Sequence, residues 1–281
     1  MKIKFLGTCA AEGFPAMFCQ CPVCEKAREK GGKNIRTRSQ AVIDDTLLID
    51  FPADTYMHVL TGGLDLIKIK ALLITHGHDD HIYPWDIMYR ESKYGHLKNE
   101  DEKEPLPVLA TAASGKDFID VFNKKCVGEK DPKALKYKEI KPFCEYEIEG
   151  YTVIPLKADH AKHLDPFIYL ILKDNKALLY AHDTVYFPEE TWEYLENRGV
   201  HLDFVSLDCT SVIKDYAVSN HMGLKACIDV KNQLLKTNAD ENTVFILNHF
   251  SHNGGYIYDD LVPVAKEKGF LVSYDGAEFQ F

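Results

Sequence analysis

Four side chains that can bind a metal ion lie within six residues of the chain: His76, His78, Asp80 and His81. Imidazole nitrogens and carboxylate oxygens are the ligands that hydrolytic zinc sites use. The apolar run at residues 69–75 predicts a buried β-strand, and residues 82–91 predict a helix. The four side chains would then occupy a short loop at the carboxyl end of a strand, where open α/β sheets usually bind ligands.

Three further apolar segments are predicted strands that lead to potential ligands. Residues 152–156 lead to Asp159 and His160, residues 177–181 to His182 and Asp183, and residues 244–248 to His249. This pattern favours one site whose ligands converge from several strands. His163 is an alternative to His160, which is preferred because it lies nearer the strand. His182 should point away from Asp183 if strand alternation continues, so it is interpreted as a core residue or a neighbour of the ligands.

The spacing HxHxDH at residues 76–81 resembles the signature of the metallo-β-lactamase superfamily. This resemblance implies an α/β fold, an αββα sandwich of two mixed β-sheets flanked by helices. It also implies two catalytic metals, with Asp183 between them as a bridging ligand. The implied ligands of the first metal are His76, His78 and His160. The implied ligands of the second metal are Asp80, His81 and His249.

Such a metal pair would activate water for attack on an ester. Two divalent ions about 3.5–4 Å apart lower the pKa of a water between them toward neutrality, so that a metal-bound hydroxide can attack. The charges of the ions, the two aspartates and the hydroxide sum to about +1, which suits an anionic phosphodiester. Zinc, manganese or iron could fill the site. Mononuclear use, or iron redox chemistry, would need the same ligand types.

A second motif, CxCxxC, places Cys19, Cys21 and Cys24 in a long polar segment at residues 8–40. Three thiolates this close favour a soft tetrahedral metal, and structural zinc is the expected occupant. His252, in the same HxxH motif as His249, is the candidate fourth ligand. Such a site would anchor the long segment, which has no predicted secondary structure. Most of the other cysteines are expected to pack in the core.

The composition favours a globular protein without a basic surface. The 281-residue chain is 46% hydrophobic and 27% charged, which is typical of one large domain, here residues 1–281. Its net charge of −10 argues against nucleic-acid binding and leaves a small anionic substrate as the expected partner. No apolar stretch of about 18 residues and no signal peptide is found, so a cytoplasmic location without membrane contact is expected. The oligomeric state is left open, with a homodimer as one alternative.

The remaining pattern predicts a β-rich first half and a mixed second half. Hairpin turns are predicted at Asp44-Asp45, Gly150 and Asp174-Asn175. Helices are predicted at residues 55–60, 115–123, 188–197, 221–236 and 258–267. Residues 124–142 are charged and are expected to be irregular.

The motif order narrows the resemblance. A glycine-rich start, a CxCxxC loop, HxHxDH and a final HxxH resemble the phosphoribosyl cyclic phosphodiesterases of bacterial phosphonate breakdown. Residues 12–15 also resemble a pyrroloquinoline-quinone biosynthesis family, which departs from the full ligand set. The resemblance implies a dinuclear phosphodiesterase acting on a small cyclic ribose phosphodiester. A hydrolase of a lactone or thioester, and a non-enzymatic metal-binding accessory protein, are the alternatives.

His221 and Asp80 are the expected catalytic residues. His221 lies between the strands that end at Asp208 and His249, which matches the non-ligand catalytic histidine of that family and implies a general acid. The amino terminus of the following helix would disfavour an imidazolium, so a bound phosphate or a carboxylate such as Asp79 would have to offset it. Candidate substrate contacts are Arg36, Arg38, Arg90 and Lys162.

Overall fold

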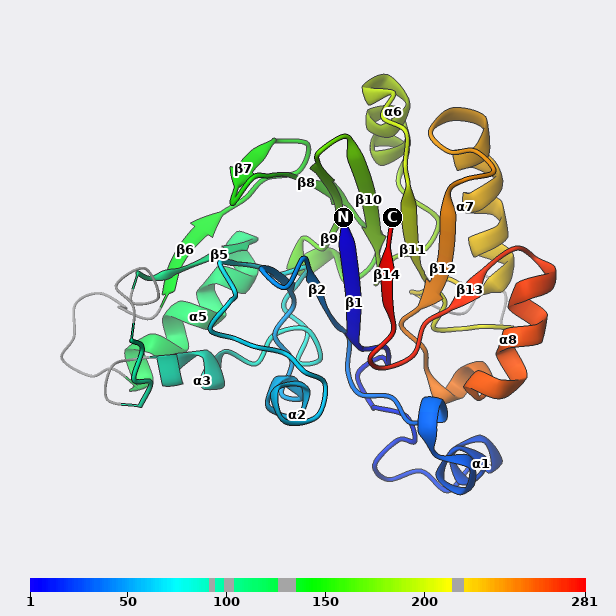
Figure 1. Ribbon diagram of the computed structural model, residues 1–281, viewed down its shortest axis with the longest axis horizontal. Helices are drawn as coiled ribbons and strands as arrows, with labels where there is room; N and C mark the ends of the chain where they lie inside the picture. Colours follow the sequence, from blue (N-terminus) through cyan, green and yellow to red (C-terminus); the bar gives the residue numbers. More distant parts are fainter. Residues whose placement is uncertain (91–93, 99–103, 126–134, 214–219) are drawn as a thin grey trace.

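Two seven-stranded mixed sheets organise the chain. The computed structural model describes residues 1–90, 94–98, 104–125, 135–213 and 220–281. The first sheet has the order β14-β1-β2-β3-β4-β5-β6, and the second has the order β13-β12-β11-β10-β9-β8-β7. The first half of the chain builds the first sheet, and the last strand crosses back to pair with β1. The two chain ends therefore lie side by side (Figure 1).

The first sheet carries short strands that are mostly buried. Their bounds are β1 Lys2–Gly7, β2 Gln40–Ile43, β3 Leu47–Ile49, β4 Ala71–Leu73, β5 Leu106–Ala110, β6 Leu135–Glu139 and β14 Glu278–Gln280. The strands from β3 to β6 are parallel, so their carboxyl ends share one edge of the sheet. The predicted turn between β2 and β3 is confirmed, because Asp44 and Asp45 have φ values of 47° and 58°. Both values fit the left-handed residues of a tight hairpin.

The second sheet has longer strands and a parallel half of its own. The bounds of its strands are β7 Tyr146–Ile148, β8 Tyr151–Lys157, β9 Phe167–Lys173, β10 Lys176–Ala181, β11 Phe204–Asp208, β12 Val244–Asn248 and β13 Leu271–Val272. The strands from β10 to β13 are parallel. Asp174 and Asn175 form the predicted turn between β9 and β10, with φ values of 50° and 62°.

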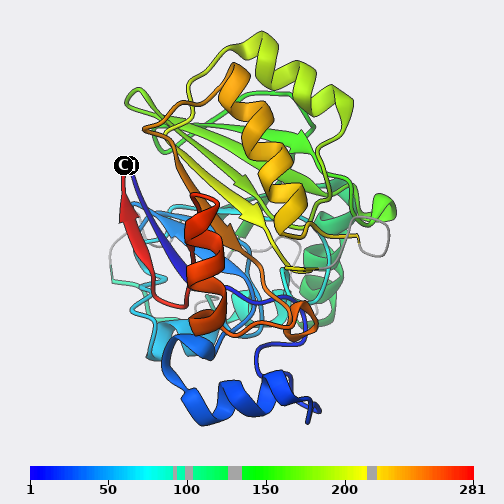
Figure 2. The same cartoon turned by 90° about the vertical axis from the view of Figure 1, so that its right-hand side faces the viewer.

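Helices cover the outer faces of both sheets. The α-helices are α1 Pro22–Lys30, α2 Thr55–Leu60, α3 Pro84–Ile87, α5 Ala112–Lys125, α6 Glu189–Arg198, α7 Leu224–Thr237 and α8 Tyr258–Glu267. Short 3-10 helices are η1 Gly32–Asn34, η2 Met88–Arg90, η3 Lys162–Leu164 and η5 His252–Gly254. Figure 2 shows α6, α7 and α8 over the outer face of the second sheet.

Three buried clusters hold these layers together. The cluster between the sheets includes Phe5, Tyr169 and Phe204, all fully buried. A second cluster joins the outer face of the second sheet to α6, α7 and α8, and a third joins the first sheet to α3 and α5. Burial of this apolar surface is the main force that favours the layered arrangement. The predicted αββα sandwich is therefore confirmed.

Four segments differ from the sequence prediction. The segment at residues 8–40 contains helix α1, which begins with Pro22. The segment at residues 124–142 contains strand β6, while its residues 126–134 lie outside the described part of the chain. The predicted helix at residues 82–91 is only the short α3 followed by η2, and residue 91 is not described. The helix predicted from residue 221 begins at Leu224.

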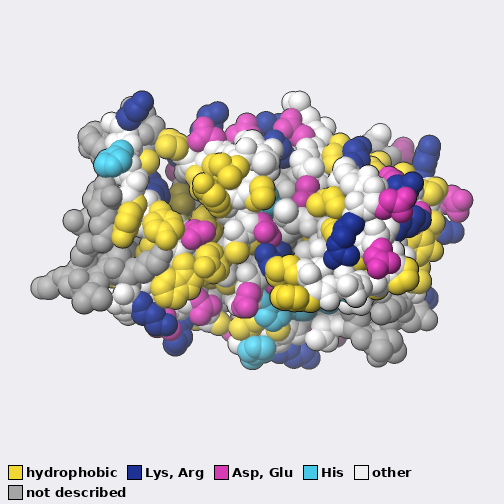
Figure 3. Space-filling model, turned by 90° about the horizontal axis from the view of Figure 1, so that it is seen from below, with side chains coloured by type: hydrophobic (Ala, Val, Ile, Leu, Met, Phe, Trp, Pro, Cys, Tyr) yellow, Lys and Arg dark blue, Asp and Glu magenta, His cyan; other side chains and the backbone are white. Residues whose placement is uncertain are grey.

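The underside of the molecule carries exposed apolar side chains. Figure 3 shows hydrophobic side chains gathered on this face beneath α2 and α3. Those of α2 are Tyr56, Met57 and Leu60, which are between 49% and 66% exposed. None of the described helices combines the length and the apolar character that crossing a membrane would need.

Candidate metal centre

The first predicted ligand trio comes together between the two sheets. His76 and His78 follow β4, and His160 follows β8. The Nε2 atom of His76 lies 2.9 Å from Nδ1 of His78, which lies 3.2 Å from Nε2 of His160. Ligand atoms about 3.3 Å apart are expected around one tetrahedral ion with bonds of about 2.0–2.1 Å. The three nitrogens therefore fit the coordination sphere of a single metal.

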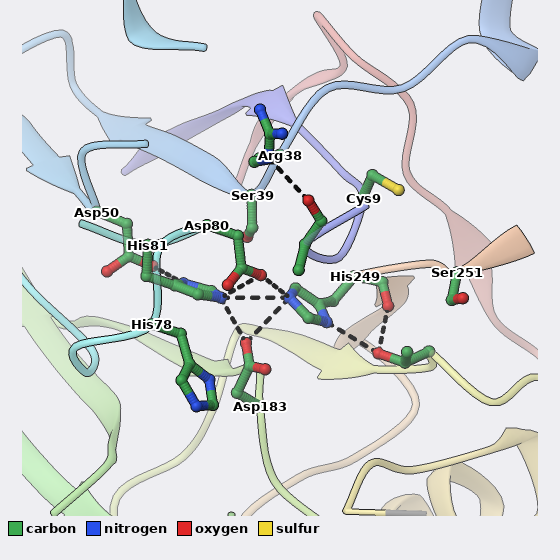
Figure 4. Close-up of polar contacts among 12 residues, drawn as sticks. Cys9, Arg38, Ser39, Asp50, His78, Asp80, His81, Asp183, His249 and Ser251 are labelled. Atoms are coloured by element: carbon green, nitrogen blue, oxygen red, sulfur yellow. Dashed lines mark hydrogen bonds and ion pairs between the residues drawn. The ribbon is translucent and has the colours of Figure 1, made fainter. Parts of the chain in front are cut away.

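The second trio lies beside the first. The Nε2 atom of His81 lies 3.3 Å from Nε2 of His249 and 3.3 Å from Oδ2 of Asp80. The Asp80 oxygen lies 3.8 Å from Nε2 of His249. Figure 4 shows His81 and His249 pointing toward each other, with Asp80 on one side of the pair and Asp183 on the other.

Asp183 spans the two trios. Its Oδ2 atom lies 2.9 Å from Nε2 of His81 and 3.0 Å from Nε2 of His249, while Oδ1 lies 3.6 Å from Nε2 of His160. The Oδ2 atom is buried and accepts no well-aligned hydrogen bond. A buried carboxylate oxygen without a hydrogen bond is costly unless a cation binds it. The structure thus places Asp183 where the sequence predicts a bridging ligand, and metal binding by all seven residues stays a prediction.

The electrostatics of the second trio favour a cation at the same point. Burial disfavours the charged form of His249, yet the carboxylates of Asp183 and Asp80 raise its pKa to about 10. The same carboxylates, together with Asp50, raise the pKa of His81 well above its usual value against the effect of burial. Positive charge is therefore favoured where two ring nitrogens meet two carboxylates, which a divalent ion satisfies.

Neighbouring polar groups leave the Nε2 lone pairs of four histidines free to bind a metal. Nδ1 of His81 lies 2.7 Å from the Asp50 carboxylate, and Nδ1 of His160 lies 3.0 Å from the Asn220 carbonyl. Both partners can only accept, so each Nδ1 must donate. The Thr210 hydroxyl donates to the His249 carbonyl, so Nδ1 of His249 donates to that hydroxyl at 2.8 Å.

The same logic applies to His76. The Thr75 hydroxyl donates to Asp50, and Nδ1 of His76 lies 3.1 Å from the Thr75 oxygen. Nδ1 of His76 is then the donor, and its Nε2 faces His78. Burial also lowers the pKa of His76 well below its usual value, which keeps the ring neutral as a metal ligand must be. Such outer hydrogen bonds fix tautomer and ring orientation in metal sites.

Asp50, Thr210 and the Asn220 carbonyl were not predicted from the sequence. Asp50 directly follows the apolar strand β3, so the strand-end pattern that led to Asp183 and His249 would also have found it. Asp50, Asp183 and His249 all have left-handed backbones, with φ values of 64°, 52° and 60°. Left-handed non-glycine residues cost free energy and concentrate at functional sites.

The two histidines left open by the sequence are now placed. His163 lies exposed on η3, away from the trios, whereas His160 is part of the first one. His182 is buried, and its ring centroid lies 3.9 Å from that of Tyr180. Its Nε2 atom forms a hydrogen bond of 2.7 Å with Ser206 Oγ. It packs in the core beside the site, as predicted.

His221 lies at the edge of the site and is oriented by Asp208. Its Nδ1 is 2.8 Å from Asp208 Oδ2 and 3.7 Å from Asp183 Oδ1. Burial alone would lower the pKa of His221, but the Asp208 and Asp183 carboxylates outweigh it and raise the pKa. The predicted role of Asp79 as the offsetting carboxylate is wrong, because Asp79 is exposed and the carboxylates that raise the pKa of His221 are those of Asp208 and Asp183.

A pocket of about 420 Å³ opens onto these ligands. Its polar lining includes five of the seven predicted ligands and six further side chains: Glu12, Thr210, Ser211, His221, Ser251 and Asn253. Among the described lining residues there is no lysine or arginine. Positive charge for an anionic substrate would therefore come mainly from bound metals.

The four basic residues predicted to contact the substrate do not line this pocket. Arg36 is buried, donates to Thr8 Oγ1 and the Ser273 carbonyl, and stacks over the Phe250 ring. Arg38 pairs with Asp54 at 3.0 Å and donates to the Ala11 carbonyl. Lys162 is exposed beside a different pocket, and Arg90 lines a third one near Ile69.

The cysteine motif forms a separate cluster. The sulfurs of Cys19, Cys21 and Cys24 and a ring nitrogen of His252 all lie within 4.8 Å of one another. His252 Nδ1 is 3.6 Å from Cys19 Sγ and 3.5 Å from Cys21 Sγ. Sulfur and nitrogen ligands of one tetrahedral zinc are expected about 3.6 Å apart. Against the effect of burial, the Cys24 N–H and the His252 ring lower the pKa of Cys21 to about 6, which favours the thiolate.

Cys21→Ser is expected to lower the melting temperature while leaving specific activity per folded molecule largely unchanged. Cys21 is also the N-cap of α1, and serine caps helices well, so the loss would come from the zinc site. Because zinc binding contributes to folding, we expect a loss of at least about 2 kcal/mol, on the order of 5 °C. Thermal melts of this variant and of the exposed-cysteine control Cys144→Ser measure it. An unchanged melting temperature with zinc still bound would contradict the structural role.

Comparison with known proteins identifies the family. Residues 49–246 match the model of the β-lactamase superfamily domain. The chain belongs to this superfamily. Members of the superfamily are metal-dependent hydrolases, phosphodiesterases among them, and they bind divalent metals such as zinc.

One curated relative and three solved structures illustrate the similarity. Coenzyme PQQ synthesis protein B of Methylobacterium radiotolerans is 32% identical over 95 residues, which span 29% of this chain and only 31% of that protein. A diphosphatase from the PhnP family has a TM-score of 0.72 at 21% identity, covering 100% of this chain and 97% of its own. Zn²⁺-bound PqqB from Methylobacterium extorquens has a TM-score of 0.73 at 16% sequence identity, and the match covers 100% of both chains. Human short-form tRNase Z has a TM-score of 0.65 at 13% identity, and the match covers 100% of this chain and 99% of that one. At these identities the structures show that the fold is shared.

Proposed function

We propose that this protein is a dinuclear metal-dependent phosphodiesterase that opens a small cyclic ribose phosphodiester. The observation that carries the proposal is the convergence of seven ligand side chains into two adjoining trios bridged by Asp183. When bound, the metals would activate water and neutralise charge on the phosphoryl group.

The charge of the pocket supports an anionic substrate. Two divalent ions less the charges of Asp80 and Asp183 leave about +2 at the site before water loses a proton. The described lining carries no lysine or arginine that would add to it. Once the water loses a proton the balance falls to about +1, which matches the single negative charge of a phosphodiester better than the two charges of a phosphomonoester.

The residues of the chain supply orientation and a proton. Asp50, Thr210 and the Asn220 carbonyl hold the histidine rings in place, so the ligands need little rearrangement. His221 donates Nδ1–H to Asp208, which directs its Nε2 away from that carboxylate. In this proposal Nε2–H of His221 protonates the departing ribose oxygen, and Asp208 stabilises the charged ring before transfer.

A non-enzymatic role in cofactor biosynthesis is the second candidate. The local match to coenzyme PQQ synthesis protein B and the shared fold of Zn²⁺-bound PqqB favour it. Such a role does not require a general acid held by a carboxylate, and this chain has one in the His221–Asp208 pair. The complete set of ligand-type residues also fits an enzyme better.

A substrate panel tests the proposal. Protein reconstituted with zinc or manganese is assayed on ribose cyclic phosphates, a lactone and a thioester. Chromatography separates each cyclic phosphate from its ring-opened product. We expect ring opening of the cyclic phosphates with kcat/KM at least about a hundredfold above that for the lactone or thioester, a difference of about 3 kcal/mol. Turnover of the lactone or thioester alone, or of none of the panel, would contradict the phosphodiesterase assignment.

A further inference from the structure

The carboxylate of Glu12 lies between the cysteine cluster and the catalytic pocket. It lines the pocket and is 30% exposed. Its Oε1 atom accepts a hydrogen bond from the Ser251 hydroxyl and lies 3.7 Å from Nε2 of His252. One oxygen of Glu12 thus meets two consecutive residues of the segment that carries both His249 and His252.

Main-chain pairing holds Glu12 in this position. Cys9 forms a parallel bridge with Phe250, whose N–H donates to the Thr8 carbonyl at 2.9 Å. The Ala10 N–H donates to the Phe250 carbonyl at 3.0 Å. Because the two segments are paired just before Glu12 and Ser251, the contact between these side chains follows from the backbone.

Ser251 extends the same arrangement to His252. The Ser251 hydroxyl oxygen accepts the Asn253 N–H at 3.1 Å and so caps η5, the turn that carries His252. Nδ1 of His252 faces the sulfurs of Cys19 and Cys21, while Nε2 faces Glu12. A carboxylate on the far nitrogen of a ligand histidine favours the tautomer that leaves the near nitrogen free to bind metal.

We propose that Glu12 is a positioning residue that orients His252 toward the cysteine cluster and ties this cluster to the wall of the catalytic pocket through Ser251. The inference rests on the proposed metal site of the cysteine cluster. It does not depend on which ester the enzyme cleaves. The cysteine loop would then anchor the amino-terminal segment beside the pocket.

Cobalt binding to the cysteine cluster tests this role without an activity assay. Co²⁺ bound by thiolates gives a sulfur-to-metal absorption band that histidine and aspartate sites lack, so the band reports the cysteine cluster alone. Zn²⁺ is then titrated in to displace Co²⁺. The variants are Glu12→Ala, Glu12→Gln and the control Glu29→Gln, whose carboxylate is exposed on α1.

We expect Glu12→Ala to weaken metal affinity at this cluster about 10- to 100-fold, which is the usual effect of removing an outer partner of a ligand histidine. Glu12→Gln should lose less, because its amide oxygen can still accept from the Ser251 hydroxyl and lie beside His252, although it carries no charge. Glu29→Gln should match the parent protein.

Parental affinity in both Glu12 variants would overturn the proposal, and so would an equal loss in the Glu29 control. Should Glu12→Ala fail to fold, Glu12→Gln decides the question by the same titration. If the parent protein hydrolyses no phosphodiester, the proposed function is refuted, but the cobalt titration still tests the role of Glu12.

Discussion

Asp183→Ala is expected to lose the catalytic metals and turnover together. Asp183 is the residue whose two carboxylate oxygens reach both trios, at 3.6 Å from His160 on one side and 2.9 Å from His81 on the other. Its removal leaves the two metals without a shared ligand and takes away one negative charge from a buried site. We expect kcat/KM to fall by at least about a thousandfold, or about 4 kcal/mol of transition-state stabilisation.

Elemental analysis and kinetics on the same samples check this prediction. Asp159→Ala is the matched control, since Asp159 also follows an apolar strand but lines a different pocket. The control should keep its metals and its activity, and the thiolate–cobalt band of the cysteine cluster should survive in both variants. Full turnover by Asp183→Ala with both catalytic metals bound would show that Asp183 is not the bridge.

His221→Ala is expected to keep its metals and to lose most turnover on a substrate with an alkoxide leaving group. An alkoxide needs a proton as it departs, and a positioned acid contributes roughly a hundredfold or more. A nitrophenolate is a much better leaving group, so the loss on a nitrophenyl phosphodiester should be far smaller. The dependence of the loss on the leaving group is the signature of a general acid.

Kinetics on both esters, with metal content measured in parallel, separate the alternatives. His163→Ala, which removes an exposed histidine on η3, is the control and should match the parent on both esters. Equal losses of His221→Ala on the two esters would exclude the acid role. Loss of a catalytic metal would instead make His221 a ligand, which its position 3.7 Å from Asp183 Oδ1 allows.

The strand-end pattern predicted much of the site because it depends on local features. An apolar run predicts a buried strand, and parallel strands such as β10, β11 and β12 bring their carboxyl ends to one edge. This is why His76, Asp183 and His249 could be found in the sequence and are close together in the structure. Asp50 obeys the same pattern after β3.

Contacts made by long-range packing could not be predicted. The sequence suggested Asp79 as a carboxylate beside His221, whereas the fold brings Asp208 there, 2.8 Å away. Likewise, nothing in the sequence distinguishes a buried arginine from a surface one. Arg36 is buried against Phe250 by the pairing of two segments more than two hundred residues apart.

Two segments were predicted to lack regular structure because their polar composition is typical of loops. Helix α1 begins in a polar segment after a cysteine cap, although Pro22 at its first turn is a start signal that could have been used. Strand β6 is the charged edge of the first sheet, with the sequence LKYKE. Charged side chains are typical of edge strands, so its polarity indicated an edge rather than an irregular segment.

The metal content of the intact protein tests the central claim most directly. Protein purified under metal-replete conditions is dialysed against metal-free buffer and analysed by elemental mass spectrometry against protein concentration. The two trios bridged by Asp183 and the separate cysteine cluster predict three metal ions per chain, one of them zinc held by thiolates. A single metal ion per chain under these conditions would contradict the dinuclear site.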